Sequence, residues 1–286
     1  MSFAAKVKRV SKSLLKRVKG LGFEEEIYRA VIRPGDVIFD IGAYVGGVSL
    51  FTARLSKPKG QVIAFEPVWS SYIQLCRNIQ SDIFGKSLIV PVPFGVAETE
   101  KTALVQIPTN DGGASCATTA SREAWSEYKK KKTAFTSVNC SFVSIDGYLK
   151  EKNVAGPNFI KIDVEGGELF VFRGASRMFE SGNRPLMLIE VFAPLERTFG
   201  YTPWDVLSLL KSYGYRFFFM CPEGLIDHDP SLKMPFPPEY VGGYNIIAYC
   251  DKDHTDRIRN LKRLLMGARS RSFKMSPPPQ PNYIGA

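Results

Sequence analysis

The sequence lacks the cysteine patterns that build a disulfide framework or a zinc site. Its five cysteines are odd in number, lie far apart and include no Cys-x-x-Cys pair. No apolar run approaches the roughly 18 residues that a membrane span requires, and residues 1–20 lack the unbroken apolar core of a signal peptide. These absences argue against a disulfide-rich secreted domain and a membrane-spanning helix, and they predict a location in the cytoplasm.

Linker-like breaks and internal repeats are absent as well. Hydrophobic strand patterns follow one another from residue 37 to residue 249, and a domain of this size buries about 75% of its unfolded surface. We therefore expect one domain over residues 23–266. Residues 1–22 are expected to form a basic amphipathic helix, and residues 267–286, rich in Arg, Lys and Pro, a disordered tail.

Positive charge is concentrated in two places, although the whole chain carries a formal charge of +10. Residues 1–20 hold seven Lys or Arg and no acid, and residues 129–132 are four consecutive lysines. Residues 4–19 place apolar side chains at helical spacing, which leaves two interpretations. The helix lies on an anionic membrane surface, which makes the protein peripheral to a membrane, or its apolar stripe docks on its own domain.

Short β-branched and aromatic runs alternate with helical patterns, which is typical of a mostly parallel sheet in an α/β, Rossmann-like fold. The predicted strands are Val37–Ile41, Gln61–Glu66, Leu88–Val92, Phe159–Asp163, Leu186–Val191, Tyr215–Met220 and Tyr244–Tyr249. The predicted helices are Glu24–Ile32, Val48–Ser56, Ser70–Gln80, Gly167–Phe179 and Pro203–Lys211. Between the third and fourth strands, Thr102–Ile107 and Ser137–Ile145 have the pattern of an inserted strand pair.

The first predicted strand runs into a glycine turn that opens a helix. Gly42 and Gly46 let the backbone approach a ligand, and the free N–H groups at the helix start can bind its polar groups. A nicotinamide-dinucleotide fingerprint needs Gly-x-Gly-x-x-Gly, but Tyr44 stands where the second glycine belongs. The turn therefore favours a ligand without a pyrophosphate.

Carboxylates close the first two strands. Asp40 precedes the glycine turn and suits a cofactor that presents an ammonium group, such as the methionine end of S-adenosylmethionine. Glu66 closes the second strand, where such folds bind ribose hydroxyls. The predicted cofactor-binding residues are Asp40, Gly42, Ala43, Tyr44, Gly46, Glu66 and Pro67.

Further acids follow the fourth and fifth strands, so they are expected to border the same pocket. Asp163, Glu165 and Glu190 are the predicted catalytic residues, with Asp163 favoured as the general base. His228, between two aspartates in the long proline-rich connection from Pro222 to Pro238, is a further candidate base, and that connection is predicted to be a lid. Two carboxylates are too few to predict a Mg²⁺ site, so no metal is expected.

The sequence resembles the FkbM-type family of class I S-adenosylmethionine-dependent methyltransferases. The resemblance rests on Asp40-Ile41-Gly42-Ala43, Ala64-Phe65-Glu66-Pro67, Ser144-Ile145-Asp146-Gly147-Tyr148-Leu149 and, above all, Lys161-Ile162-Asp163-Val164-Glu165-Gly166. It spans residues 36–249, although the family pattern usually has Asn where Tyr44 stands. It implies a seven-stranded sheet with an antiparallel last strand, S-adenosylmethionine as cofactor, and methyl transfer to a hydroxyl of a sugar, glycan or secondary metabolite.

Three alternatives stay open at the level of sequence. The positive charge and the run of lysines from Lys129 suit an RNA methyltransferase, because such patches contact phosphates, but no separate RNA-binding module is visible. A non-catalytic Rossmann-like binding protein would keep the pocket without methyl transfer. A nicotinamide-dependent oxidoreductase is disfavoured by the missing second glycine.

Overall fold

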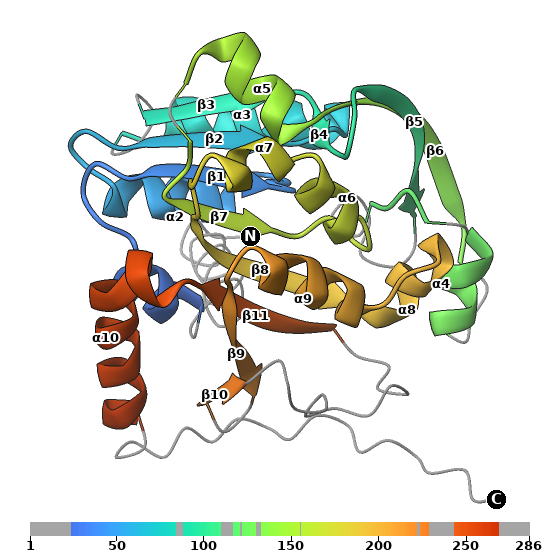
Figure 1. Cartoon of the computed structure of the whole chain (residues 1–286). Helices are drawn as coiled ribbons and strands as arrows, with labels where there is room; N and C mark the ends of the chain where they lie inside the picture. The colour runs from blue at the N-terminus through green and yellow to red at the C-terminus, as the bar shows by residue number, and fades with distance from the viewer. Residues whose placement is uncertain are drawn as a thin grey trace, which may run out of the picture.

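The computed structural model describes residues 24–83, 88–109, 117–120, 122–129, 133–154, 156–221, 224–228 and 243–268. Its main element is an eight-stranded sheet in the order β10-β9-β11-β8-β7-β1-β2-β3 (Figure 1). Five neighbouring strands run parallel: β1 (Val37–Ile41), β2 (Gln61–Phe65), β3 (Ile89–Val92), β7 (Phe159–Ile162) and β8 (Leu186–Phe192). The strand β11 (Gly243–Tyr249) is antiparallel to both β8 and β9 (Arg216–Cys221).

The seven strands predicted from the sequence are therefore confirmed, including the antiparallel last strand. An eighth strand, β10 (Gly224–His228), pairs antiparallel with β9 at the edge of the sheet. It lies inside the connection predicted as a lid, and the rest of that connection falls outside the described residues. The strands β1 and β7 are buried almost throughout, as expected of parallel strands covered on both faces.

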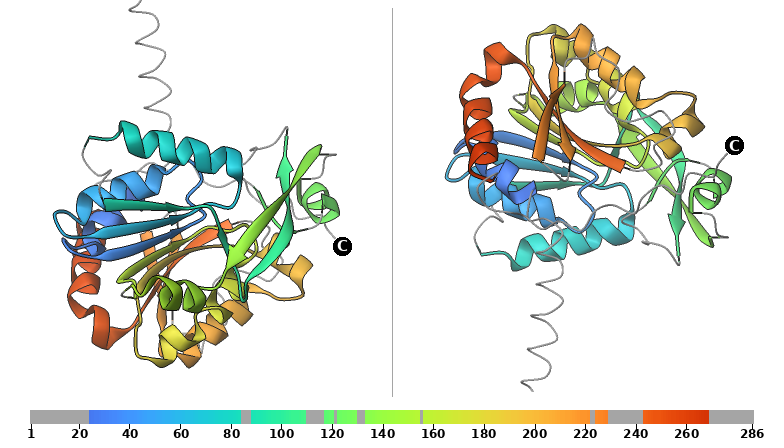
Figure 2. Two further views of the ribbon diagram at one scale, coloured as in Figure 1. Left: turned by 90° about the horizontal axis from the view of Figure 1, so that it is seen from above. Right: turned by 90° about the horizontal axis from the view of Figure 1, so that it is seen from below.

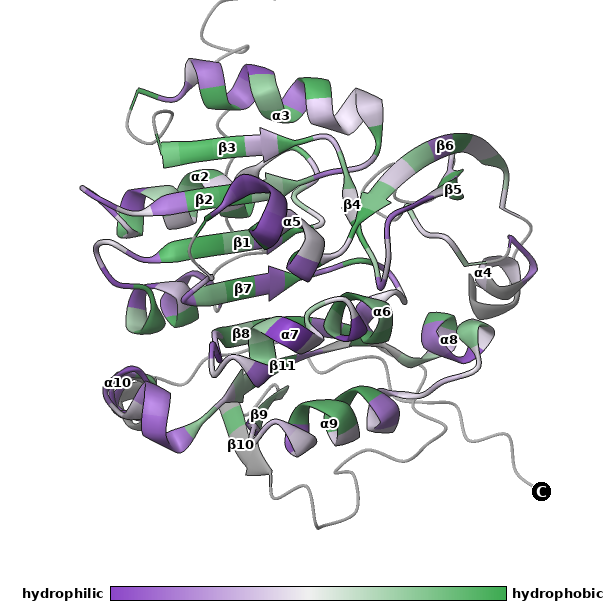
Figure 3. Ribbon diagram, turned by 45° about the horizontal axis from the view of Figure 1, so that its top comes forward, coloured by the Kyte–Doolittle hydropathy of each residue, from purple (hydrophilic) through white to green (hydrophobic). Residues whose placement is uncertain are grey.

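Helices cover both faces of the sheet. One face carries α5 (Ile145–Lys152), α6 (Glu168–Arg173), α7 (Ser176–Glu180) and α9 (Pro203–Ser212). The other face carries the helix at residues 24–31, α2 (Gly47–Leu55), α3 (Trp69–Ser81) and α10 (Asp251–Ala268). Apolar and polar residues alternate along α3 at helical spacing, with Leu75 and Ile79 buried toward the sheet (Figure 3).

A second, three-stranded sheet stands at one end of the molecule (Figure 2). It is formed by β4 (Gly95–Val96), β6 (Phe135–Val143) and β5 (Lys101–Pro108), in that order. The antiparallel pairing of β5 with β6 confirms the predicted inserted strand pair. Gly95 packs directly against Phe142, because a Cβ atom at residue 95 would lie 2.3 Å from the phenylalanine ring.

The predicted helix over Gly167–Phe179 is wrong as a single element, because α6 and α7 are separate helices. The break falls at Gly174, where a Cβ atom would lie 2.2 Å from the carbonyl oxygen of Ala97. The carboxylate of Asp146 accepts hydrogen bonds from the N–H groups of Arg177 and Met178, at 2.9 Å each. A side chain distant in sequence therefore starts α7.

Four helices were not predicted from the sequence: α4 (Arg122–Lys129), α5, α8 (Ala193–Glu196) and α10. The predictions for residues 1–22 and for the tail concern segments outside the described residues, apart from the last turn of α10. They stay predictions, as does the role of the lysines that follow α4. Among the described residues, no helix combines the length and the apolar character needed to cross a membrane.

Candidate active site

A cavity of about 640 Å³ lies where β1, β2 and β7 end, beside the inserted sheet. This volume is in the range of small-molecule sites, and ligands of open α/β sheets bind at the carboxyl ends of the strands. Seven residues predicted as site residues line the cavity together: Gly42, Ala43, Tyr44, Glu66, Pro67, Asp163 and Glu165. The topology therefore gathers most of the predicted cofactor and catalytic residues in one place.

The turn after β1 fits tightly between its neighbours. The N–H groups of Gly42 and Ala43 both donate to the carbonyl oxygen of Phe65, at 3.1 and 2.9 Å. Gly42 has a φ of +86°, and a Cβ atom there would lie 1.9 Å from the carbonyl oxygen of Asp163. Only glycine satisfies both the left-handed conformation and this close approach. Tyr44 adopts a positive φ of 51° in the same turn, a conformation that is uncommon outside glycine.

Glu66 is held by the turn that it helps to form. One carboxylate oxygen accepts from the N–H of Tyr44 and the other from the N–H of Val68, each at 2.8 Å. Burial raises the pKa of Glu66 to about 7, against the opposing effect of these two hydrogen bonds. Because a carboxylate has about four acceptor sites, both oxygens can still accept hydroxyl groups from the cavity.

Two predicted cofactor residues lie behind the cavity wall. Asp40 is 1% exposed, does not line the cavity, and accepts a hydrogen bond from the hydroxyl of Ser49 in α2. Burial raises its pKa to about 6, whereas the bond from Ser49 and the nearby Lys161 lower it. Gly46 caps α2 with a φ of +87° and is also outside the wall. Both residues therefore lie behind the residues that line the cavity. The sequence predicted that Asp40 contacts the cofactor directly, whereas in the structure its side chain contacts Ser49.

A buried lysine faces the predicted catalytic aspartate at the end of β7. The ammonium of Lys161 lies 3.0 Å from a carboxylate oxygen of Asp163. The lysine side chain is 5% exposed and that of Asp163 is 37% exposed, so the aspartate alone reaches the cavity. Burial opposes the charged form of Lys161, but the carboxylates of Asp163, Glu190 and Glu24 outweigh it and raise its pKa well above the usual value.

Glu165 follows two residues later in a positive-φ conformation, with φ 53°. The hydroxyl of Thr118 donates to its carbonyl oxygen at 2.6 Å and fixes the loop. Burial, followed by the negative charges of Asp163 and Glu190, raises the pKa of the Glu165 side chain to about 9. At neutral pH this carboxyl group therefore carries a proton.

Glu190 is not brought into the cavity wall. The charge of Asp163, followed by burial, raises the pKa of Glu190 to about 7, so Glu190 sits beside the aspartate and behind the wall. His228 lies on β10, paired with Phe217 near the start of β9 at the far edge of the sheet. Within the described ranges, no group of three or more His, Cys, Asp or Glu side chains is placed to hold a metal ion.

Several cavity residues were missed from the sequence. Lys101 comes from β5, Phe142 from β6 and Phe170 from α6, and Thr118 lies in the described segment between the paired strands. Asn78 reaches the cavity from α3, where its side chain donates to the carbonyl oxygen of Val45 at 2.7 Å. Only the fold brings these elements together, and no local sequence signal marks them.

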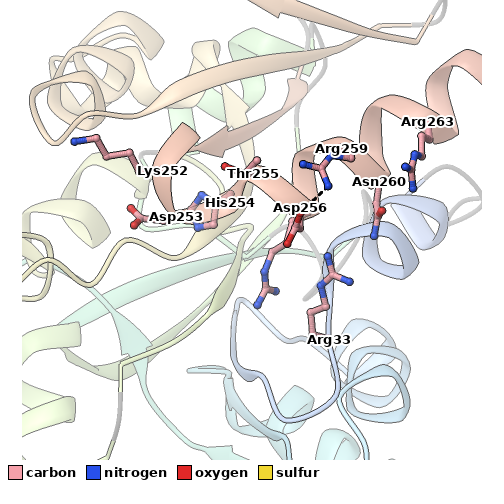
Figure 4. A pocket seen from close by; sticks show the side chains of 10 residues that line it. Arg33, Lys252, Asp253, His254, Thr255, Asp256, Arg259, Asn260 and Arg263 are labelled. Atoms are coloured by element: carbon pink, nitrogen blue, oxygen red, sulfur yellow. Dashed lines mark hydrogen bonds and ion pairs between the residues drawn. The ribbon is translucent and has the colours of Figure 1, made fainter.

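A second cavity, of about 430 Å³, lies along α10 (Figure 4). It is lined mainly by charged side chains, among them Arg33, Lys252, Arg257, Arg259 and Arg263. Arg257 is bound to Asp36, and Arg33 and Asp36 precede β1, so this cavity lies at the amino ends of the strands. Asp253 and Asp256 line it as well, and Arg259 pairs with Asp256. Ligands of open α/β sheets bind at the carboxyl ends of the strands, so the first cavity is the candidate active site.

Residues 40–217, well over half of the chain, match the family model described as the methyltransferase FkbM domain. The protein is an S-adenosylmethionine-dependent methyltransferase with a Rossmann-like fold. It belongs to the FkbM methyltransferase family.

Individual proteins that match the chain have low sequence identity to it. A hexuronic acid methyltransferase from Haloferax volcanii is 24% identical over 199 residues, which cover 68% of this chain and 71% of that protein. An FkbM methyltransferase structure from Methylobacillus flagellatus is 18% identical with a TM-score of 0.44, and the match covers 78% of this chain but only 49% of that one. Fibrillarin from Aeropyrum pernix, solved with bound S-adenosyl-L-methionine, is 13% identical over 76% of this chain and 67% of that one, with a TM-score of 0.38.

Proposed function

We propose that the enzyme transfers a methyl group to a hydroxyl oxygen of a sugar, a glycan or another small hydroxylated molecule. The observation that carries the proposal is one cavity that combines the turn at Gly42, the doubly hydrogen-bonded Glu66 and the ion-paired Asp163. The curated relative from Haloferax volcanii, a hexuronic acid methyltransferase, supports a sugar as acceptor.

The residues present fit a sulfonium cofactor. The carboxyl groups of Glu66 and Asp163 make part of the wall acidic, which suits a positively charged ligand. The side chains of Ile41, Val48 and Leu50 add apolar surface. We assign the ribose hydroxyls to Glu66 and the methionine end to the turn from Gly42 to Tyr44. Asp40 supports this turn through Ser49 in the first turn of α2. When bound, the cofactor supplies a methyl group that is already activated as an electrophile.

The remaining task of the protein is to position the acceptor and to remove its proton. We assign the base to Asp163, because its side chain lines the cavity and the Lys161 ammonium, 3.0 Å away, holds it in place. Glu165 is a poorer base at neutral pH, since its raised pKa of about 9 keeps it protonated. During methyl transfer to the acceptor oxygen, the hydroxyl proton would pass to the carboxylate of Asp163.

A test uses the full chain with S-adenosylmethionine labelled in the methyl group. Candidate acceptors are offered as sugars, glycans, RNA and total protein, and the label is followed into each fraction. The proposal predicts label in the sugar or glycan fraction and S-adenosylhomocysteine in equal amount. Label confined to RNA or protein would contradict the proposed acceptor class while leaving the methyltransferase chemistry intact.

A further inference from the structure

We infer that Lys101 binds an anionic group of the acceptor, so that the substrate class of this cavity is a carboxylated sugar. The inference deepens the proposed function and rests on it, because it concerns the acceptor half of the same cavity. Lys101 is the first residue of β5 and lines the cavity from the inserted sheet. The cofactor residues Gly42 to Tyr44 and Glu66 line it from the ends of β1 and β2.

Charge singles out Lys101 from the rest of the wall. Among the described residues that line the cavity it is the one cation, and the same wall holds the carboxyl groups of Glu66 and Asp163. A neutral sugar could enter such a cavity without a cation. An acceptor that carries a carboxylate would be repelled by these acids. The ammonium group of Lys101 can offset this repulsion by attracting the carboxylate.

In the described part of the chain, the neighbouring acids Glu98 and Glu100 form no ion pair with Lys101. Glu98 pairs with Arg173 at 3.7 Å, and the carboxylate of Glu100 turns toward α5, where it lies 3.5 Å from the position of a Cβ atom on Gly147. The ammonium of Lys101 instead lies 5.9 Å from the ring centre of Phe142 and 5.6 Å from that of Phe170. Contacts with ring faces hold a cation in place without neutralising it.

The same two rings suit a sugar. Both Phe142 and Phe170 line the cavity, and the C–H face of a pyranose packs against apolar ring surface. A sugar ring that rests on these phenylalanines would bring a carboxylate within reach of Lys101, whose side chain is exposed. Lys101 is therefore a specificity-determining residue, which selects the acceptor and takes no part in proton transfer.

The experiment compares two probes that differ only at carbon 6, methyl β-D-glucuronide and methyl β-D-glucoside. The variants are Lys101→Gln, Lys101→Arg and, as a matched control, Lys150→Gln, which removes an exposed lysine outside the cavity wall. Three quantities are measured for each: kcat/KM for both sugars, the Kd for S-adenosylhomocysteine, and the Kd for the glucuronide on protein loaded with S-adenosylhomocysteine.

The proposal predicts that the wild type prefers the glucuronide. Lys101→Gln should lose about ten- to a hundredfold in glucuronide binding and in kcat/KM for it, the range for a lost hydrogen bond to a charged group. Its glucoside rate and its affinity for S-adenosylhomocysteine should match those of the wild type and of Lys150→Gln. Lys101→Arg keeps the charge and should retain most of the binding.

Two outcomes would overturn the inference. Equal handling of the two sugars by the wild type excludes a carboxylated acceptor, and weakened S-adenosylhomocysteine binding in Lys101→Gln assigns the lysine to the carboxylate of the cofactor. Failure of the proposed function has a different signature, namely methylation of neither sugar by a wild type that binds S-adenosylhomocysteine. Glucuronide binding to the loaded protein, lost in Lys101→Gln, still decides the role of Lys101 in that case.

Discussion

The ammonium of Lys161 lies 3.0 Å from the carboxylate of Asp163 at the end of β7, with the lysine buried and the aspartate open to the cavity. Lys161 and Asp163 lie two residues apart in the sequence, but their side chains have different roles. The lysine supplies a fixed positive charge from inside the sheet, and the aspartate presents the opposite charge to a ligand.

Replacing Lys161 by Met should destabilise the protein, because it removes the cation that compensates Asp163 and the neighbouring Glu190. Breaking a fully buried pair costs about 3–5 kcal/mol, and the 37% exposure of Asp163 reduces this to roughly 1–3 kcal/mol. Urea denaturation measures the change. Lys150→Met, at an exposed position of α5, is the control and should have almost no effect. A Lys161→Met protein as stable as the wild type would contradict the role of the pair.

Gly42→Ala should weaken both folding and cofactor binding. The new Cβ atom meets the carbonyl oxygen of Asp163 at 1.9 Å, so the turn must move away from β7. Gly35→Ala is a matched control, since Gly35 has a similar φ of +90° but nothing within 4 Å of a Cβ atom. Backbone strain of about 1–3 kcal/mol is common to both variants. Calorimetry should therefore show weakened S-adenosylhomocysteine binding only in Gly42→Ala, and equal binding in the two variants would exclude the close contact as the cause.

Glu66→Gln tests the proposed ribose ligand while keeping the size of the side chain. An amide can accept hydrogen bonds at one atom only, so it cannot satisfy Tyr44 N–H and Val68 N–H together and still bind two hydroxyls. We expect the affinity for S-adenosylhomocysteine to fall about ten- to a hundredfold. Glu100→Gln, outside the cavity wall, serves as the control. Calorimetry that finds the same Kd in Glu66→Gln as in the wild type would remove Glu66 from the ribose site.

Stability of the ligand-free protein should fall as the pH rises from about 6.5 to 9. The pKa values of Glu66 and Glu165 are raised to about 7 and about 9, so the folded protein keeps protons that the unfolded chain has already released. The unfolded state then binds fewer protons, and stability decreases with rising pH. His254, whose pKa burial lowers to about 4, acts in the opposite direction only below this window. Melting temperatures of the wild type and Glu165→Gln should diverge between pH 7 and 9, and a flat wild-type curve would contradict the raised pKa values.

Much of the sheet could be predicted because its strands are short, apolar and buried on both faces, as in β1 and β7. The helix α10 could not, because eight of its eighteen residues are charged. Among its side chains that the structure describes, Ile258 and Leu261 are the apolar ones buried in the core. Tertiary contacts stabilise it instead: the guanidinium of Arg257 binds both carboxylate oxygens of Asp36, at 2.6 and 2.8 Å. The hydrophobic pattern of one segment cannot predict a contact with a residue more than two hundred positions away.

In the candidate active site, too, some residues could be predicted from the sequence and others could not. Glu66, Asp163 and Glu165 follow strand ends, so the topology alone predicts that they meet. Asp40 also sits at a strand end, but its side chain points under α2 to Ser49, and the sequence does not indicate which acid faces the cavity. Lys101 and Phe142 belong to an insertion whose orientation is set by packing contacts such as that of Gly95 against Phe142. The place of such residues in the cavity wall becomes visible only in three dimensions.

The most direct test of the account is Asp163→Asn, which preserves the shape of the side chain and removes its capacity as a base. Cofactor affinity, melting temperature and methyl-transfer rate should be measured on one preparation, with the acceptor identified by label transfer. The account predicts nearly unchanged binding of S-adenosylmethionine and a loss of roughly 10²–10⁴-fold in rate, the range for a positioned general base. Full turnover by a stable Asp163→Asn protein, or a parallel fall in stability and cofactor binding that explains the lost rate, would contradict it.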